Sequence, residues 1–203
     1  MFKLLYWLVI PFYKLLYRPK IYGKENIPKS GGYVFVCNHF AKVDALVFVA
    51  LHKGKINFMA KKEWFDSKFK NKLFRFLGAI PVDREKADFT SIKACLSVLK
   101  SGKPLVVFPE GTRNKINDEL QEIHGGANLL AYKADVPIVP VGMNSRFKKF
   151  GKNYLVIGKP YNLEKTENRY TSETSEKADA LMREKLNECI FAAQEHAKKG
   201  SEK

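Results

Sequence analysis

Short apolar runs that recur between helix-length segments constrain the fold of this chain more than any other feature. The first run, at residues 33–37, is apolar at every position without alternation, which is typical of a strand buried on both faces. Strands are predicted near residues 33–37, 56–60, 79–82, 104–108, 137–141 and 154–157. Their alternation with helical segments favours an α/β fold, in which a twisted, mostly parallel sheet is flanked by helices on both faces.

Two helices and one unusual strand stand out in this pattern. Apolar positions at helical spacing and a following glycine predict a helix over residues 88–101. A second helix near 174–198 has an apolar face and a charged face, and we expect it to pack on the sheet. The run 136–141 holds Pro137 and Pro140, which lack backbone donors, so this strand is predicted to be irregular or near an edge.

His39 and Asp44 follow the first predicted strand and form the pair with the clearest chemical potential. Five residues at roughly 100° each would set them about 140° apart on one continuous helix, too far to meet. If the helix begins after His39, the imidazole lies on the strand-to-helix turn and the carboxylate can fold back to a ring nitrogen. A base oriented by an acid in this way activates a hydroxyl nucleophile.

The N-terminal segment is apolar and aromatic, with basic residues at both ends. The part between Lys3 and Lys14 has about half of the ~20 residues needed to cross a bilayer. Basic rather than small residues follow it, which argues against a cleaved secretory signal. We therefore expect residues 1–22 to form an interfacial anchor helix, while a helix packed on the protein's own core is the alternative. No linker divides the remaining residues 23–203.

Charge and cysteine content narrow the partners and the compartment. The net charge of +15 favours a polyanionic partner or an anionic surface. Residues 53–75 hold eight Lys or Arg against two acids, interleaved with aromatic residues. Such a stretch binds nucleic acid or an anionic membrane, or forms the solvated face of a helix, and the N-terminal segment favours the membrane. The cysteines lie among apolar residues and are predicted to be reduced packing residues in the cytosol: Cys37, Cys95 and Cys189.

Two further strand ends carry charged residues. The run 104–108 is followed by the block Pro-Glu-Gly-Thr-Arg, and the run 79–82 leads to Arg84. Ligands gather at the carboxyl ends of parallel strands, so His39, Glu110 and Arg113 are predicted to share one crevice. Guanidinium groups bind phosphate in a bidentate fork, which suits a substrate with both a phosphate and a hydroxyl. For Arg84 or Glu110 alone, a surface ion pair is the simpler interpretation, and the ligand spacing of a zinc site is missing.

Together these residues resemble the four ordered blocks of the glycerolipid acyltransferases, above all the 1-acylglycerol-3-phosphate acyltransferase branch. The blocks are Asn38-His39 with Asp44, and residues 78–84, 108–113 and 136–141, so the resemblance covers roughly residues 20–160. The order of the His-x4-Asp pair and the Pro-Glu-Gly-Thr-Arg block is highly specific. The resemblance implies a glycerol-3-phosphate acyltransferase-like fold, with the acyltransferase domain at 23–203 closed by a packing helix.

The resemblance also implies a reaction and its partners. A fatty acyl chain passes from acyl carrier protein or acyl-CoA to the sn-2 hydroxyl of lysophosphatidic acid, which gives phosphatidic acid for phospholipid synthesis. The protein is expected at the cytoplasmic face of the cell membrane, as a peripheral or monotopic protein on an anionic membrane surface. We expect no cofactor beyond this acyl thioester, no metal, no acyl-enzyme and no nucleic-acid partner.

The site residues follow from the same blocks. His39 is expected to be the general base. Asp44 is expected to orient the imidazole and to favour its charged form. The acceptor is expected to be held by the residues of the third block, Glu110, Gly111, Thr112 and Arg113, with help from Arg84. Backbone amides near Gly111 are expected to face the developing oxyanion. The acyl pocket is expected to be shaped or supported by Val136, Pro137 and Ile138.

Two departures from the family pattern keep alternatives open. Ala41 stands where many members carry Ser, a change that costs ~1 kcal/mol if the Ser only caps the helix. His124 stands where a Lys is common, which leaves the acceptor open: glycerol 3-phosphate and other lysolipids are alternatives. From other classes, a phosphate-ester hydrolase or a non-catalytic basic module that binds lipid or nucleic acid also fits parts of the pattern.

Overall fold

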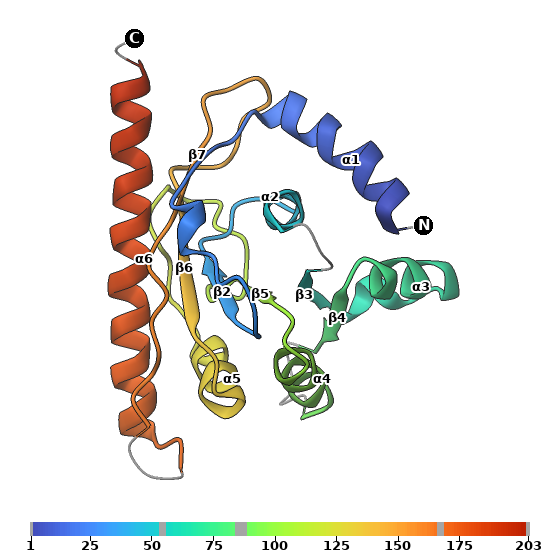
Figure 1. The fold of residues 1–203 in the computed structure, drawn as a ribbon, viewed down its shortest axis with the longest axis vertical. Coiled ribbons are helices and arrows are strands. Elements are labelled where there is room, and N and C mark those ends of the chain that lie inside the picture. The colour runs from blue at the N-terminus through green and yellow to red at the C-terminus, as the bar shows by residue number, and fades with distance from the viewer. Residues whose placement is uncertain (1, 53–55, 84–88, 166–168, 202–203) are drawn as a thin grey trace.

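The computed structural model describes residues 2–52, 56–83, 89–165 and 169–201, and gives only the backbone for residues 2–9. Its centre is a seven-stranded sheet in the order β1-β7-β6-β2-β5-β3-β4 (Figure 1). The strands are β1 (Lys20–Tyr22), β2 (Val34–Cys37), β3 (Asn57–Lys61), β4 (Ala79–Val82), β5 (Leu105–Val107), β6 (Ile138–Met143) and β7 (Tyr154–Ile157). Among these strands, β6 and β7 pair antiparallel and the other neighbours pair parallel. The predicted α/β class with a mostly parallel sheet is confirmed.

Helices cover both faces of this sheet, as predicted. The α-helices are α1 (Phe2–Tyr17), α2 (Ala45–Leu51), α3 (Lys68–Phe76), α4 (Phe89–Lys100), α5 (Gly126–Ala134) and α6 (Ser172–Ser201), joined by short 3-10 turns at Lys24–Asn26 and Lys62–Phe65. One core cluster lies between the sheet and the helices α1 and α2, and a second lies between the sheet and α4, α5 and α6 (Figure 1). All four residues of β2 are buried, as expected for a strand covered on both faces.

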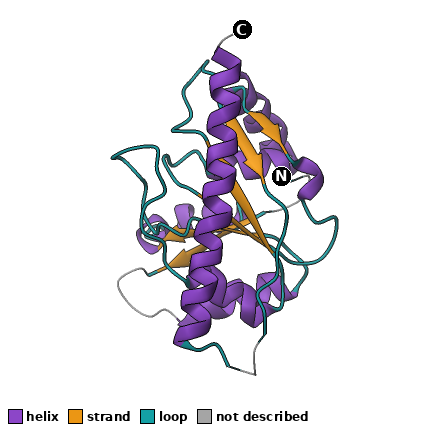
Figure 2. Ribbon diagram, turned by 90° about the vertical axis from the view of Figure 1, so that its left-hand side faces the viewer, coloured by secondary structure: helices purple, strands orange, loops and turns teal. Residues whose placement is uncertain are grey.

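The long C-terminal helix α6 packs closely against the sheet. In the view of Figure 2 it runs in front of the strands over most of the height of the molecule. Gly142 of β6 makes this approach possible, because a Cβ atom there would lie 2.3 Å from the backbone of Cys189 and of Ile190. The predicted packing helix near 174–198 is therefore present and extends over residues 172–201. The helix predicted at 88–101 is also present over 89–100, and residue 88 lies outside the described residues.

The position predicted for the proline-containing strand was wrong. β6 is central, between β7 and β2, and all of its residues are buried. Pro137 precedes the strand and offers only its carbonyl, which accepts the Val34 N–H at 3.0 Å. Pro140 likewise acts as an acceptor, because its carbonyl receives the Gly158 N–H at 2.8 Å. Both prolines therefore contribute a carbonyl acceptor to a neighbouring segment. A central strand can hold a proline at such a position.

The N-terminal helix α1 uses one side to pack on the protein. Ile10 and Tyr13 are buried, and Tyr13 belongs to the core cluster beneath α2. Phe12 and Leu15 on the same helix are exposed, at 63% and 59%. One face of α1 therefore packs on the core of the protein, as the alternative prediction described. Another face is apolar and exposed to solvent. Within the part of the chain that the structure describes, no helix is long and apolar enough to cross a membrane.

Candidate active site

The turn after β2 brings His39 and Asp44 together. β2 ends at Cys37 and α2 begins at Ala45, so both residues lie in the connection between strand and helix. His39 Nδ1 is 3.0 Å from Asp44 Oδ2. This is the geometry that the spacing predicted for a helix beginning after the histidine. Because Asp44 faces Nδ1, the proton of the neutral imidazole lies on Nδ1 and the basic nitrogen is Nε2.

Asp44 is buried and held by the turn itself. Its side chain is 1% exposed, and Oδ2 also accepts the N–H groups of Phe40 and Ala41, each at 2.7 Å. Ala41 takes part through its backbone alone, so the turn forms without a side-chain hydroxyl at that position. Three donors therefore converge on one oxygen, and they fix the position of the Asp44 carboxylate beside the imidazole.

Glu110 lies behind the histidine and binds the backbone. It is 2% exposed; Oε1 accepts the His39 N–H at 2.7 Å and Oε2 accepts the Gln121 N–H at 3.2 Å. Burial raises the pKa of Glu110 above its ordinary value, while the two N–H groups act in the opposite direction. Each oxygen accepts a backbone N–H, so the carboxylate holds the turn that carries His39.

Asn38, the residue before the histidine, ties the end of β2 to β6. Its Oδ1 accepts the Met143 N–H at 2.9 Å and its Nδ2 donates to the Met143 carbonyl at 3.0 Å. The side chain thereby continues the ladder between the two strands beyond the last paired residue. Asn38 was predicted only as part of a motif, and this contact was not predicted. A buried Asn after an apolar strand is the signal that marks it.

The imidazole opens into a cavity of about 360 Å³. Phe108 stacks on the His39 ring with 4.0 Å between centroids. Arg113 lines the same cavity, as predicted, and Lys42 lines it from the turn, with Nζ 5.8 Å from the centre of the Trp64 ring. The remaining lining residues are Ala45, Phe58, Met59, Ala60, Lys61 and Thr112. Lys42 and Trp64 were missed as site residues, although Lys42 lies within the His-x4-Asp spacing.

A second cavity, of about 450 Å³, borders the first. Met59, Phe108 and Thr112 line both cavities. The second lies over α4 and α5, and most of its walls are apolar side chains: Met59, Val82, Ile92, Val107, Phe108, Leu129 and Leu130. The third sequence block lies between the two cavities. The remaining lining residues of the second cavity are Pro109, Glu110, Gly111, Thr112, His124, Gly126 and Ala127.

Several predicted site residues lie elsewhere or act differently. The Gly111 N–H donates to the Phe108 carbonyl at 3.0 Å, so this amide is used within the turn in the structure. Val136, Pro137 and Ile138 lie at the start of β6, where Ile138 pairs with Val34 at the opposite end of β2 from His39. They line neither of the two cavities. Arg84 lies outside the described residues.

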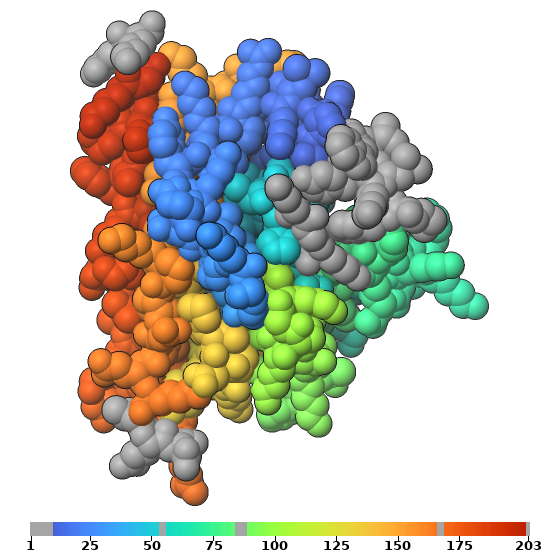
Figure 3. Space-filling view, viewed as in Figure 1, coloured from blue at the N-terminus to red at the C-terminus, as the bar shows by residue number. Residues whose placement is uncertain are grey.

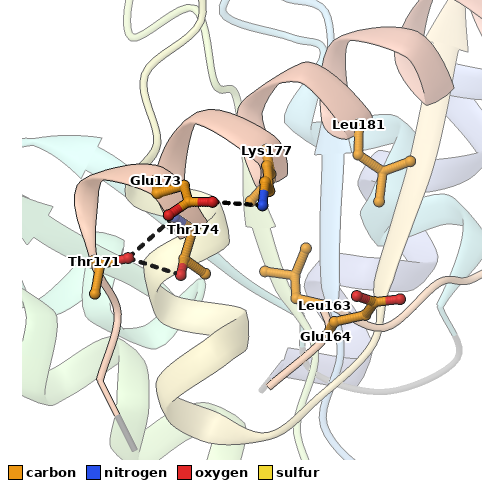
Figure 4. A pocket seen from close by; sticks show the side chains of 8 residues that line it. Leu163, Glu164, Thr171, Glu173, Thr174, Lys177 and Leu181 are labelled. Carbon is orange, nitrogen blue, oxygen red and sulfur yellow. Dashed lines mark hydrogen bonds and ion pairs between the residues drawn. The ribbon is translucent and has the colours of Figure 1, made fainter. Parts of the chain in front are cut away.

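A third cavity, of about 430 Å³, lies at the start of α6 (Figure 4). Its polar side chains bind one another, because Lys177 pairs with Glu173 at 2.7 Å and Thr171 lies 3.0 Å from Thr174. It shares no lining residue with the two cavities near His39. Among the described residues, no group of three His, Cys, Asp or Glu residues is placed to hold a metal ion.

The site belongs to a recognisable class. A histidine oriented by a buried carboxylate, at the ends of parallel strands and beside cationic side chains, is the arrangement of an enzyme that activates a hydroxyl for attack on an acyl or related group. An apolar cavity beside it suits a lipid chain.

Comparison with known proteins defines the class further. The acyltransferase family model matches residues 18–144. The 1-acyl-sn-glycerol-3-phosphate acyltransferase of Bacillus subtilis is 36% identical over 148 residues, which are 70% of this chain and 72% of that protein. The human alpha form of the same enzyme is 34% identical over 137 residues, or 65% of this chain and 48% of that protein. The crystal structure of the 1-acyl-sn-glycerophosphate (LPA) acyltransferase PlsC from Thermotoga maritima superposes with a TM-score of 0.65 at 20% identity, covering 93% of this chain and 82% of that one, and shows a shared fold.

The chain therefore belongs to the acyltransferase family. The relatives described above are 1-acyl-sn-glycerol-3-phosphate acyltransferases.

Proposed function

We propose that this protein transfers a fatty acyl chain from a thioester to the sn-2 hydroxyl of lysophosphatidic acid, which gives phosphatidic acid. The observation that carries the proposal is the His39–Asp44 pair, joined at 3.0 Å and opening into a cavity that Arg113 and Lys42 also line. The names of the relatives support the same acceptor. Acyl carrier protein and acyl-CoA both present the thioester that this chemistry needs.

The proton transfers follow from the orientation of the imidazole. Because Asp44 holds Nδ1, His39 Nε2 takes the proton of the acceptor hydroxyl while its oxygen attacks the thioester carbonyl. The resulting imidazolium is stabilised by the Asp44 charge. When the tetrahedral intermediate collapses, the C–S bond breaks and the thiolate takes the proton back from Nε2. The ester and the free thiol are formed and the neutral histidine is restored, without an acyl-enzyme.

Two cations provide the site for the acceptor phosphate. Arg113 and Lys42 line the His39 cavity from different segments, and neither forms an ion pair with an acidic side chain within the described residues. Arg113 provides the planar fork that matches phosphate oxygens, and Lys42 provides a point charge. We place the acyl chain in the neighbouring apolar cavity, because most of its walls are apolar. This location replaces the one expected at the start of β6, which lies at the opposite end of β2 from His39.

A membrane surface is the partner we propose for the exposed apolar side chains. α1 leaves Phe12 and Leu15 in solvent, and α3 leaves Phe69 exposed at 77%. α3 carries four Lys or Arg and no acid, and Figure 3 shows it as a projection at the rim of the molecule. Basic residues beside apolar ones favour binding to anionic lipids. We therefore propose peripheral association with the cytoplasmic face of the membrane.

The test is an acyl-transfer assay that crosses donors with acceptors. Purified protein in mixed micelles is given labelled acyl-CoA or acyl-ACP, with lysophosphatidic acid, glycerol 3-phosphate or lysophosphatidylcholine as the acceptor. We expect labelled phosphatidic acid as the main product and no release of inorganic phosphate. His39→Ala should abolish the formation of labelled phosphatidic acid, while the melting temperature of the variant stays near that of the parent protein.

The matched control is His196→Ala. His196 stacks on Tyr22 at 3.8 Å and lines none of the cavities, so its loss should leave transfer unchanged. Activity of the His39 variant equal to that of the parent protein would refute the proposed mechanism. Preferential labelling of glycerol 3-phosphate would refute the proposed acceptor.

A further inference from the structure

The segment between β5 and α5 folds into a compact loop around the catalytic turn. Residues 109–124 contain no helix or strand, and the His124 N–H donates to the Pro109 carbonyl at 2.8 Å, which joins the two ends of the loop. Glu110 lies at its beginning and Gln121 near its end, and the Gln121 N–H binds the Glu110 carboxylate. The shape of this loop therefore determines where Glu110 holds the catalytic turn.

Asn114 organises the loop from inside. Its side chain is buried, with 3% of the residue exposed. Oδ1 accepts the Ile116 N–H at 2.9 Å and the Asn117 N–H at 3.3 Å, while Nδ2 donates to the Glu119 carbonyl at 2.6 Å. One amide side chain thus satisfies three backbone groups that have no regular secondary structure to pair with.

The backbone of Asn114 reaches the catalytic histidine directly. Its N–H donates to the His39 carbonyl at 2.6 Å, while Glu110 accepts the His39 N–H at 2.7 Å. The loop therefore binds His39 through both of its backbone polar groups. The Asn114 carbonyl in turn accepts a hydrogen bond from Arg146 Nη2 at 3.3 Å, and the Gln121 carbonyl accepts one from Arg183 Nη1 at 3.5 Å. These two arginines tie the loop to the segment after β6 and to α6.

We propose that Asn114 is a positioning residue for His39. Without its side chain, three backbone groups of the loop lose their partner, and the loop no longer fixes its two contacts to the His39 backbone. The imidazole then departs from the alignment with Asp44 and the acceptor hydroxyl, and a misplacement of about 1 Å lowers turnover about 10²-fold. The proposal rests on the acyltransferase chemistry proposed above for its kinetic consequence, and on the hydrogen bonds alone for its structural one.

A matched pair of variants separates positioning from simple loss of stability. Asn153 is also a buried asparagine, at 2% exposure, and also organises a loop: Oδ1 accepts the Lys148 N–H and Nδ2 donates to the Lys148 carbonyl, both at 2.8 Å. It lies before β7 and lines none of the cavities. Asn114→Ala and Asn153→Ala should therefore lower the melting temperature by similar amounts. We expect kcat to fall about 10²-fold only in Asn114→Ala, with KM for lysophosphatidic acid within threefold of the parent value.

Two further readouts complete the test. Asn114→Ser keeps an acceptor for the Ile116 N–H, so its kcat should lie between those of the parent protein and Asn114→Ala. The NMR signal of the His39 Nδ1 proton, assigned with His39→Ala, should shift or broaden in Asn114→Ala and stay unchanged in Asn153→Ala. This signal is independent of the substrate, so it tests positioning even if the proposed acceptor is wrong. Equal kcat in the two alanine variants together with an unchanged proton signal would overturn the proposal.

Discussion

Replacing Asp44 by Asn isolates the charge of the carboxylate from its role as an acceptor. Oδ2 accepts three donors, and two of them are the backbone N–H groups of Phe40 and Ala41 at 2.7 Å. In Asp44→Asn these two N–H groups exclude the amide nitrogen from the Oδ2 position, because donor would face donor. The amide oxygen must take that position, where it still accepts the His39 Nδ1 proton. The variant therefore keeps the tautomer that makes Nε2 basic.

The expected loss in kcat is that of the charge. The amide nitrogen takes the buried Oδ1 position, which has no hydrogen-bond partner among the described residues, so Asp44→Asn should also lower the melting temperature. Two unit charges about 4 Å apart interact by about 4 kcal/mol at an effective dielectric constant of about 20, and this sets the upper limit for what Asp44 contributes to the imidazolium. At about 1.4 kcal/mol for each factor of ten, kcat should fall by at most about 10³-fold. We expect a fall of about 10² to 10³ in Asp44→Asn. Asp44→Ala should fall further, because the tautomer is no longer fixed and two buried N–H groups lose their acceptor.

The assay measures thiol release from acyl-CoA at saturating lysophosphatidic acid, alongside thermal unfolding. The His39→Ala variant gives the residual activity that remains without the proposed base, and it serves as the lower reference value. Two results would refute the reasoning. Activity of Asp44→Asn within threefold of the parent protein would show that the charge is not used. Activity as low as that of His39→Ala would show that the backbone N–H groups do not fix the amide, and that the tautomer is lost with the charge.

Three other residues give predictions of different kinds. Burial raises the pKa of Glu110 above 4.5, so the folded protein binds this proton more readily than the unfolded chain and loses stability as the pH rises from 4.5 through the folded pKa. Glu110→Gln should remove this pH dependence in urea unfolding and lower kcat about tenfold, because Gln can accept only one of the two N–H groups; an unchanged pH dependence would contradict it. Lys42→Met should raise KM for lysophosphatidic acid but not for monoacylglycerol, and equal changes for both acceptors would exclude a phosphate contact. Phe69→Glu should weaken sedimentation with anionic vesicles while kcat in detergent micelles stays unchanged; unaltered sedimentation would exclude α3 from the membrane contact.

The sheet could be predicted from the sequence because burial on both faces leaves a clear pattern. β2 and its neighbours are short apolar runs without alternation, and the six predicted strands are all present. β1 was missed because its three residues are mostly exposed and carry no such pattern. β6 was predicted near an edge because each proline lacks a backbone N–H. A central strand can still hold a proline where the neighbouring segment needs only its carbonyl. The location of such positions comes only from the pairing of β6 with β2 and with residue 158.

The pairing of His39 with Asp44 could be predicted because the contacts that form it are local. His39 and Asp44 are five residues apart, and the same short turn supplies the N–H groups that hold the carboxylate. The contact of Glu110 could not be predicted in this way, because its partner is a backbone N–H 71 residues away. The sequence around a glutamate does not show whether its carboxylate binds a backbone N–H or a substrate. Asn114 was missed for a related reason: its partners are backbone groups of a loop, which leave no signature in side-chain chemistry.

The pairing of β2 with β5 explains why Glu110 reaches the backbone of His39. Val36 pairs with Val107 in these parallel strands, so the segments that leave their ends carry His39 and Glu110 side by side, and the His39 N–H reaches Glu110 Oε1 at 2.7 Å. Neighbouring strands lie about 4.8 Å apart, a gap that a Glu side chain can span to reach the His39 N–H. The neighbouring residues Pro109 and Gly111 have no side-chain acceptor that could replace Glu110 in this contact. The pairing of two buried strands therefore determines the position of the proposed base, which links the packing of the core to the chemistry at its edge.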